Sequence, residues 1–201
     1  MSESDSESER SGEDYSEIEG LSNSLMVAIE KEDERELSRI FTRAYNIGIL
    51  EDLVNWMPRG YNGDTPLNYA IDTCKSNHLI IMKLINAGAD VNKKSDNGLT
   101  PLSALMENSG SRSDVSCVGK RLNTLHYTYL LMNILLTHGA DVTLESNGAT
   151  PHEIASLVIE DSARVDAGYV VTKQTILDIL KHHADMIPVF KSVQTTIDNI
   201  D

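Results

Sequence analysis

Apolar residues recur along the chain at the spacing of one α-helical face, in short segments that are separated by polar turns. The clearest segment carries them in the order i, i+1, i+4 and i+5, at Ile80, Ile81, Leu84 and Ile85. This order follows the 3.6-residue period of an amphipathic helix. Aromatic residues make up only 5% of the chain, which suits helical packing of small residues better than a β-sandwich or barrel. We therefore expect an all-α fold built from short helices.

The helical segments belong to a unit that occurs three times. The unit begins with Asn-Gly-x-Thr-Pro, at residues 62–66, 97–101 and 147–151. Its second half is apolar and closes with Gly-Ala-Asp-Val, at residues 81–92 and 132–143, and in a degraded copy at 176–185. The order of elements is therefore a polar turn, a helix that begins at Thr-Pro, a second helix and a closing turn.

Each part of the unit has a local physical reason. Gly98 can take the positive φ of a tight turn. Thr100 can cap the helix that follows, and Pro101 suits its first position, where no amide donor is needed. Gly88 is expected to end the preceding helix in the left-handed conformation. One unit alone leaves a helical face uncovered, so we expect successive units to stack into a continuous core.

The two motifs, in this order, resemble the ankyrin repeat, whose signature includes Thr-Pro-Leu-His-x-Ala near its start and Gly-Ala-Asp-Val-Asn at its end. The resemblance is specific at residues 62–105 and 129–155 and covers about 22–185. It implies an ankyrin-repeat solenoid of about four helix pairs. The predicted regions are a disordered acidic Ser-rich tail at 1–21, an N-terminal capping repeat and connector at 22–58, three ankyrin repeats with long insertions at 59–185, and a C-terminal tail at 186–201.

The spacing of the units is uneven. Thr65 and Thr100 are 35 residues apart, close to the ankyrin period of about 33, whereas Thr150 follows 50 residues later. The excess lies at 107–120, between the two helices of one unit, and extra residues also stand at 161–172. Such insertions look like those of the ankyrin proteins of poxviruses and related large DNA viruses. This resemblance implies a viral protein that binds a host protein and interferes with innate immune or NF-κB signalling.

Charge narrows the choice of partner. The formal net charge is −14, from 31 acidic and 17 basic side chains, and it should repel the phosphates of nucleic acid and anionic lipid. No apolar run approaches the roughly 18 residues of a membrane helix. The two cysteines, Cys74 and Cys117, do not make a disulfide framework and favour a reducing compartment. We expect another protein as the partner, no nucleic acid, membrane or small-molecule substrate, and a cytoplasmic location with the nucleus as an alternative.

The N-terminal tail carries half of the net charge, because residues 1–20 hold eight acidic side chains and one basic one. Its candidate phosphorylation sites each have an acid three residues later: Ser4, Ser6, Ser11 and Ser16. A merely solvating tail is the simpler interpretation. The segment also loosely resembles the phosphorylated ends of the IκB inhibitors. That resemblance implies the alternative function, a cellular IκB-like inhibitor or adaptor regulated by phosphorylation of its acidic tail.

Candidate binding residues follow from the resemblance, because ankyrin proteins usually contact partners with their turn tips and the exposed face of their first helices. By position these residues are Tyr61, Asn62, Asp64, Asn68, Lys93, Lys94, Asp96, Asn97, Ser103, Glu145, Asn147 and Glu153. The tip asparagines have a simpler interpretation as turn formers. Lys93 and Lys94 form a rare basic pair, which either meets an acidic partner or is solvated.

No combination of residues indicates catalysis. The sequence has no phosphate-binding loop, nucleophile elbow or convincing acid–base pair, so we expect no enzyme, no catalytic residue, no metal and no cofactor. His182, His183 and Asp185 raise a metal-dependent hydrolase as a third hypothesis. Adjacent histidines point to different faces of a helix, however, which is poor chelation geometry. We interpret the three as degraded turn residues, since the family has Ala-Gly-x-Asp there.

Overall fold

The computed structural model describes residues 12–74, 77–111, 124–159 and 172–198. These residues contain nine α-helices and no β-strand. The helices are α1 (Gly12–Glu30), α2 (Glu34–Asn46), α3 (Leu50–Asn55), α4 (Pro66–Thr73), α5 (His78–Asn86), α6 (Pro101–Ser111), α7 (Thr124–Thr137), α8 (Pro151–Val158) and α9 (Lys173–Asp198). Within this described part, none of the helices has the length and apolarity that crossing a membrane requires.

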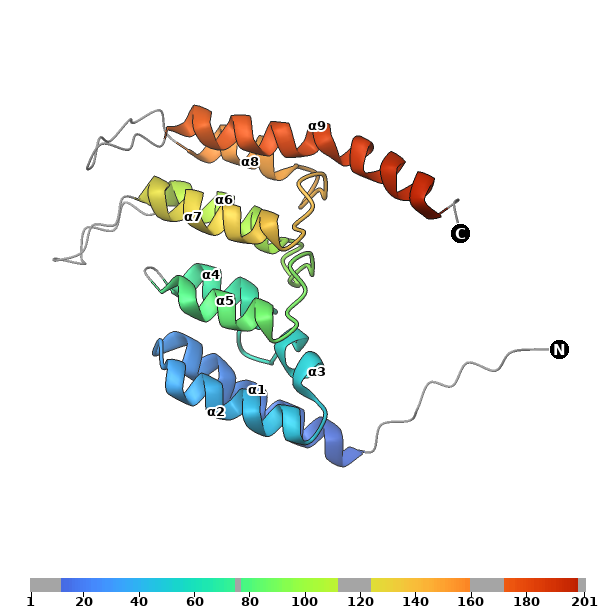
Figure 1. Ribbon diagram of the computed structural model, residues 1–201. Coiled ribbons are helices and arrows are strands. Elements are labelled where there is room, and N and C mark those ends of the chain that lie inside the picture. Colours follow the sequence, from blue (N-terminus) through green and yellow to red (C-terminus); the bar gives the residue numbers. More distant parts are fainter. Residues whose placement is uncertain (1–11, 75–76, 112–123, 160–171, 199–201) are drawn as a thin grey trace.

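Eight of the helices form four antiparallel pairs that lie one above another (Figure 1). The pairs are α1 with α2, α4 with α5, α6 with α7, and α8 with α9. The first helix of each pair packs on the first helix of the next, in the order α1, α4, α6, α8. The short helix α3 stands between the first two pairs and contacts α1, α2 and α4. The all-α prediction is therefore confirmed for the described residues.

The Thr-Pro motifs begin their helices as the sequence predicts. In each copy the threonine hydroxyl accepts a hydrogen bond from the backbone N–H three residues later, at 3.1 Å for Thr65, 3.2 Å for Thr100 and 3.3 Å for Thr150. The proline that follows each threonine is the first residue of α4, α6 or α8. Its missing N–H costs nothing there, because the first amides of a helix have no intrahelical acceptor.

Glycine ends the second helix of a pair. At Gly88, φ is +99°, and two backbone bonds close the helix. The N–H of Ala89 donates to the carbonyl of Leu84 and that of Gly88 to the carbonyl of Ile85, both at 3.0 Å. These are the two bonds of a Schellman motif. The same pair of bonds ends α2 at Gly48 and α7 at Gly139. The prediction for Gly88 is thus confirmed, and the motif extends to the N-terminal pair.

The N-terminal boundary differs from the prediction. The disordered tail was expected to reach residue 21, but α1 begins at Gly12. Ile18 and Leu21 are buried, and with Leu25 they stand three and four residues apart, so they cover the end of the core with one face of the helix. The acidic composition hid these few apolar positions. Residues 1–11, with Ser4, Ser6 and Ser11, lie outside the described residues, whereas Ser16 belongs to α1.

The C-terminal boundary differs as well. A turn was expected at His182 and His183 and a tail from residue 186, but α9 continues as a helix to Asp198. His183 occupies the position of Gly88 and Gly139 in the unit. A side chain at that position disfavours the left-handed residue that ends the other helices, so the helix runs on. The interpretation of the two histidines as turn residues is therefore wrong.

The described ends of the predicted insertions lengthen the helices beside them. The helices α6 and α7 have 11 and 14 residues, against 8 and 9 in the preceding pair α4 and α5. Part of the insertion predicted at 107–120 is thus the end of α6, which reaches Ser111. Residues 112–123 and 160–171 lie outside the described residues.

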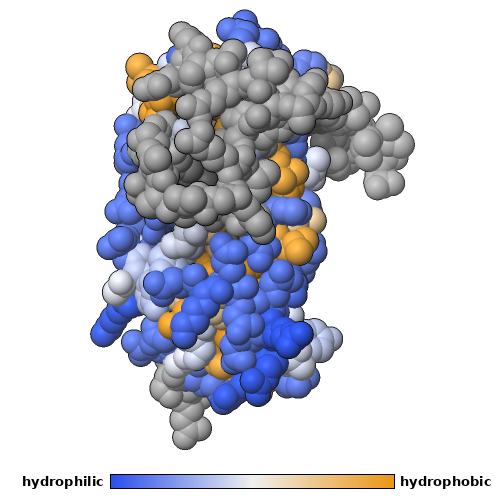
Figure 2. All heavy atoms as spheres, turned by 90° about the vertical axis from the view of Figure 1, so that its left-hand side faces the viewer, coloured by the Kyte–Doolittle hydropathy of each residue, from blue (hydrophilic) through white to orange (hydrophobic). Residues whose placement is uncertain are grey.

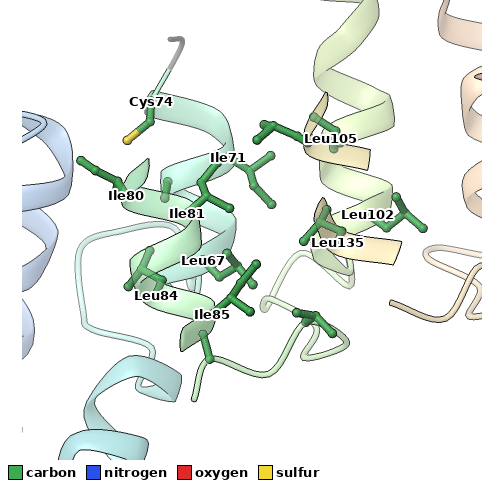
Figure 3. Close-up of a cluster of buried hydrophobic side chains, with 14 of the residues drawn as sticks. Leu67, Ile71, Cys74, Ile80, Ile81, Leu84, Ile85, Leu102, Leu105 and Leu135 are labelled. Carbon is green, nitrogen blue, oxygen red and sulfur yellow. The ribbon is translucent and has the colours of Figure 1, made fainter. Parts of the chain in front are cut away.

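One cluster of buried side chains runs from Leu21 in α1 to Leu180 in α9, and Figure 3 shows its part between α4 and α7. Ile81 and Leu84 of α5 are fully buried, and so are Met132 and Leu135, which occupy the same positions in α7. Leu67 and Ile71 of α4 lie between α5 and the next pair, as the close-up shows. Because a single helix pair cannot enclose these side chains, each pair depends on its neighbours for burial.

Two sides of the stack differ in character. In each pair, the first helix ends and the second helix begins on the left in Figure 1. Figure 2 faces that side, and the described surface in its lower half is mainly hydrophilic, with hydrophobic side chains in small separate groups. On the opposite side, the turns that lead from one pair to the next form a column. This second side carries most of the candidate residues.

Candidate functional site: the tip side of the stack

The turns at 61–64, 95–99 and 146–149 define what we call the tip side. Two of them are two-residue hairpin turns. The N–H of Asp64 donates to the carbonyl of Tyr61 at 2.9 Å, and Asn62 and Gly63 between them have φ values of +55° and +71°. Two consecutive positive φ values define a type I′ turn, for which Asn-Gly is the favoured pair. Asn62 therefore serves the turn itself.

The other two turns show that the three asparagines are not equivalent. Asn147 has φ of +53° and stands, like Asn62, in a two-residue turn. The middle turn is one residue longer: the N–H of Ser95 donates to the carbonyl of Leu99 at 3.0 Å. Only Gly98 takes a positive φ in that turn. The interpretation as a turn former thus fits Asn62 and Asn147, whereas Asn97 has no conformational requirement of this kind.

Asparagine side chains tie successive turns together. The side-chain amide of Asn55, at the end of α3, donates to the carbonyl of Gly88 at 2.9 Å and accepts from the N–H of Asp90 at 2.8 Å. Asn92 repeats both bonds one unit later with Gly139 and Asp141. Each asparagine therefore satisfies a backbone donor and a backbone acceptor of the next turn. Asn55 does this although its own segment lacks the Gly-Ala-Asp-Val motif.

The two candidate lysines form hydrogen bonds to neighbouring units. The ammonium group of Lys93 donates to the carbonyl of Asn55 at 2.8 Å, one unit back. The ammonium group of Lys94 donates to the carbonyl of Glu145 at 2.7 Å, one unit forward. The pair therefore reaches in opposite directions and binds the backbone of neighbouring turns. This arrangement gives both lysines a structural role that the interpretation as a simple basic pair did not include.

Two candidate residues are buried. Asn68 and Ser103 were expected on the exposed face of the first helices, but they are only 3% and 0% exposed. The side chain of Asn68 donates to the carbonyl of Leu99 at 3.0 Å. The hydroxyl of Ser103 accepts from Thr100 at 3.0 Å and from Ser146 at 2.8 Å. Both side chains join two units from within, and this burial contradicts their placement on an accessible face.

Glu153 closes a capping box. Its carboxylate accepts from the N–H and the hydroxyl of Thr150, both at 2.8 Å, while its own N–H donates back to that hydroxyl. The backbone bond from Thr150 is the main cause that lowers the pKa of this carboxyl. A carboxylate near a helix N-terminus is also favoured by the helix dipole. Glu153 therefore serves mainly to start α8.

Of the four remaining candidates, Glu145 is exposed just before the third turn. The other three, Tyr61, Asp64 and Asp96, gather around the first unit together with two residues of α4. The rings of Tyr61 and Tyr69 meet edge to face, with centroids 5.2 Å apart and planes at 81°. Asp96 is brought close because its N–H donates to the carbonyl of Gly63 at 2.9 Å. Its side chain lies over Gly63, where a Cβ atom would have no room. Asp72 completes the group, which we call the acidic–aromatic patch: Tyr61, Asp64, Tyr69, Asp72 and Asp96.

Burial and the closeness of these groups shift the pKa values of two of them. Burial raises the pKa of Asp64 to about 6, with further contributions from the charges of Asp72 and Asp96. Burial also raises the pKa of Tyr69, and the next cause is the charge of Glu30, which reaches the patch from α1. The patch is thus a concentration of negative charge next to two aromatic rings. Carboxylates this close disfavour each other's ionisation.

Sequence reasoning missed Tyr69 and Asp72. The signature position that was carried over was that of Asn68, which is buried. The next position, Tyr69, is more accessible. Tyr69 and Asp72 are three residues apart, so they lie on one face of α4. A search for exposed residues at this spacing would have found the pair.

The stack ends in a groove. At the junction with the last pair, Thr143 replaces the bridging asparagine, and its hydroxyl donates to Asp141 of its own turn at 2.6 Å. Because α9 does not turn back at His183, no fourth tip forms there. A groove of about 590 Å³ lies at this place, and its lining includes Val142, Thr143, Leu177 and Lys181.

The histidine and cysteine positions are also defined. The rings of His182 and His183 have centroids 6.4 Å apart. Among the described residues, no group of three or more His, Cys, Asp or Glu side chains is arranged to hold a metal ion. Cys74 is buried, its thiol contacts the carbonyl of Ile29 at 3.6 Å, and burial raises its pKa to about 11. Such a thiol is an inert core residue. Cys117 lies outside the described residues.

Comparison with known proteins identifies one part of the chain. Residues 62–96 match the family model of the ankyrin repeat. The match spans the first Thr-Pro unit, from the tip at Asn62 through α4 and α5 to the tip at Asp96, and it supports an ankyrin-repeat protein. Ankyrin repeats are generally non-catalytic modules that bind other proteins. No curated protein matches the sequence.

Proposed function

We propose that the chain is a non-enzymatic protein–protein interaction module, built as an ankyrin solenoid of about four helix pairs, and that the tip side binds the partner. The observation that carries this proposal is the ankyrin match at 62–96, within a stack whose pairs repeat the same caps and bridges. The partner is another protein, because a net charge of −14 repels nucleic acid. We propose no small-molecule substrate.

Local rigidity of the tips supports this role. The side-chain amides of Asn55 and Asn92 form hydrogen bonds to backbone groups of the next turn. The ammonium groups of Lys93 and Lys94 form further hydrogen bonds to backbone carbonyls of neighbouring units. A surface that is fixed before binding loses little conformational entropy when a partner arrives. The backbone of the tip side is fixed in this way before binding. The carboxylates of Asp96 and Glu145 on the same side are exposed, so a partner can reach them.

At a finer level, we propose a viral ankyrin protein that binds a host protein and interferes with innate immune or NF-κB signalling, in the cytoplasm of the host cell, with the nucleus as the alternative location. Support comes from the long segments between paired helices, which resemble the insertions of poxvirus-type ankyrin proteins. Expression of the chain in cells with an NF-κB reporter tests this level. Reduced signalling after stimulation is expected, and an unchanged reporter at high expression would contradict it.

The alternative is a cellular IκB-like inhibitor or adaptor regulated by phosphorylation of its acidic tail. The acid-directed serine pattern of residues 2–19 favours it. Replacing Ser11 and Ser16 with alanine should then lengthen the half-life of the protein after stimulation. An unchanged half-life would remove this alternative and leave the interaction module untouched.

The tip side is tested by quantitative affinity purification from cells that express the tagged chain. The tip variant combines Asp96→Lys and Glu145→Lys, which reverse two exposed charges on neighbouring turns. The matched control combines Glu36→Lys and Asp178→Lys, which reverse two charges on the second helices α2 and α9. We expect the tip variant to lose a partner that the wild type and the control both retain.

Two results would contradict the proposal. One is a partner retained equally by the tip variant and the control, which would place binding elsewhere on the surface. The other is the absence of any partner above background for a chain whose circular dichroism shows the helical fold.

A further inference from the structure

We propose that the acidic–aromatic patch binds an arginine side chain carried by a basic segment of the partner protein. This inference rests on the proposed function and specifies its chemistry: the first unit would recognise a guanidinium group. Two independent features point to the same ligand class, namely a pair of aromatic rings and a set of unneutralised carboxylates around them.

The aromatic pair supplies the first feature. Tyr61 and Tyr69 are half-buried: both pack against the core, and each residue remains partly accessible. Their edge-to-face contact at 5.2 Å fixes the two planes nearly at right angles. An aromatic face attracts a cation within about 6 Å, and arginine stacks on such faces more often than lysine. The pair therefore offers an ordered surface on which a planar cation can lie.

The carboxylates supply the second feature. Asp64 follows the first tip, Asp72 lies on α4, Asp96 belongs to the next tip, and Glu30 approaches from α1. In the described part of the chain, the ion pairs involve none of Asp64, Asp72 and Asp96. Lys93 and Lys94, the lysines of the neighbouring turn, are bound to backbone carbonyls. A cation from another molecule can therefore neutralise the negative charge of the patch.

The fold does not require this arrangement. A structural feature of the repeat should recur from unit to unit, as the threonine caps do. The position of Tyr69, four residues after the capping threonine, holds Ala104 in the second unit and Ile154 in the third. The position of Tyr61 holds Asp96 and Ser146. The aromatic pair is therefore particular to the first unit.

The geometry favours arginine over lysine. A guanidinium group is planar and carries five N–H donors, so it can stack on a ring and pair with carboxylates at its edge at the same time. An ammonium group is a compact, strongly hydrated charge that must give up more water to lie against a ring. Carboxylates from several elements, grouped beside two rings, suit the planar ion.

The test uses three fluorescent peptides of equal length in a Gly-Ser background, containing two arginines, two lysines or two citrullines. Their binding to the full chain is measured by anisotropy at about 150 mM salt, where the screening length is about 8 Å and long-range attraction is weak. We expect the arginine peptide to bind most tightly, the lysine peptide several-fold more weakly, and the uncharged citrulline peptide not measurably.

Variants locate the binding. Tyr69→Leu keeps apolar packing but removes the ring, and it should weaken arginine-peptide binding about 2- to 30-fold, the range of a cation–π contact. It should also remove most of the preference for arginine over lysine. Asp72→Asn changes an exposed side chain to a neutral one of the same size, so it provides a second test that does not depend on core packing.

Matched controls separate local recognition from general attraction to an acidic protein. Tyr45→Leu removes an exposed tyrosine on α2, and Glu36→Gln removes one charge from the same helix, outside the tip side. Both should leave peptide binding within about 1.5-fold of the wild type, a difference of a few tenths of a kcal/mol. Equal losses in patch and control variants, or equal binding of the arginine and lysine peptides, would overturn the inference.

Failure of this inference differs from failure of the proposed function. If Tyr69→Leu and Asp72→Asn retain the cellular partner while the double tip variant loses it, the interaction module stands and the arginine site is wrong. If no form of the chain captures a partner, the proposed function fails whatever the peptides do.

Discussion

The backbone N–H of Asp141 donates to the side-chain oxygen of Asn92 at 2.8 Å, across the junction between two helix pairs. The side-chain NH2 group of Asn92 donates in turn to the carbonyl of Gly139 at 3.0 Å. Asn55 makes the equivalent bonds one junction earlier. At these two junctions, one asparagine side chain therefore binds the backbone of the next turn, which gives the asparagine of Asp90-Val-Asn92 a structural role.

Replacing Asn92 with alanine should lower the free energy of unfolding by about 1–3 kcal/mol, because two hydrogen bonds between units are lost. Asn55→Ala should cost a similar amount at its own junction. Urea denaturation followed by circular dichroism measures both. Thr143→Ala is the control, since Thr143 bonds only within its own turn among the described contacts. A loss for Asn92→Ala no larger than for this control would contradict the bridging role.

The core offers a direct comparison within one helix. Leu84 of α5 is fully buried, whereas Leu79 of the same helix is 48% exposed. Leu84→Ala should lower the free energy of unfolding by about 2–5 kcal/mol, through lost burial and the cavity left behind. Leu79→Ala should cost less than about 1 kcal/mol. Thermal and urea melts of the two variants, side by side, test the assignment. Equal destabilisation would mean that Leu84 is not a core residue.

Tip geometry separates two asparagines that look alike in the sequence. Asn62 has φ of +55°, a conformation that costs a residue such as alanine roughly 1–2 kcal/mol. Asn62→Ala should therefore lower the melting temperature by a few degrees, while Asn62→Gly should be nearly neutral. Asn97→Ala should have little effect, because Asn97 itself does not take a positive φ in the longer turn. Similar losses for both alanine variants would refute the different turn types.

Much of the fold was predictable because its signals are local. A threonine three residues before a free amide, a proline at the first helical position and a glycine after an apolar run each act within a few residues. Thr100, Pro101 and Gly88 all behave as the sequence predicted. The failures at the two ends have local causes too, namely the sparse apolar residues of α1 and the missing glycine at His183.

The candidate site was less predictable, because it depends on which side chains meet between units. Transfer of the signature by position placed Asn68 and Ser103 on a binding face, yet each bonds to the unit that follows. The sequence does not show that Lys94 reaches the carbonyl of Glu145, 51 residues away. The patch likewise needs Asp96 to fold over Gly63, a contact between two tips.

The missing glycine can be restored. His183→Gly returns the residue that ends α5 and α7 to the corresponding position in α9. We expect the helix to end there, since glycine both favours the left-handed conformation and weakens a helix interior by about 1 kcal/mol. The far-ultraviolet signal at 222 nm should fall by an amount that matches the roughly 16 helical residues from 183 to 198. His182→Gly is the control, and it should reduce helicity less because it stands one position early.

The pH dependence of stability tests the charge of the patch. The pKa of Asp64 is raised to about 6 in the folded chain, first by burial and then by Asp72 and Asp96, from an ordinary value of 3.8. A pKa raised on folding means that the folded state holds the proton more tightly. The stabilisation is therefore fully present below about pH 3.8 and is lost as the pH rises through about 6. At neutral pH the ionised carboxylate of Asp64 therefore lowers the free energy of unfolding.

Asp64→Asn removes this cost and should raise the melting temperature at pH 7.5 by about 1–3 °C, a modest gain because the group is partly solvated. The gain should shrink toward zero as the pH falls from 7 to 4, since wild-type Asp64 then becomes neutral as well. Glu145→Gln removes one charge from the same acidic chain outside the patch, and it controls for the net charge. If both variants gained equally at every pH, the repulsion would belong to the whole protein and not to the carboxylates gathered beside Tyr61 and Tyr69.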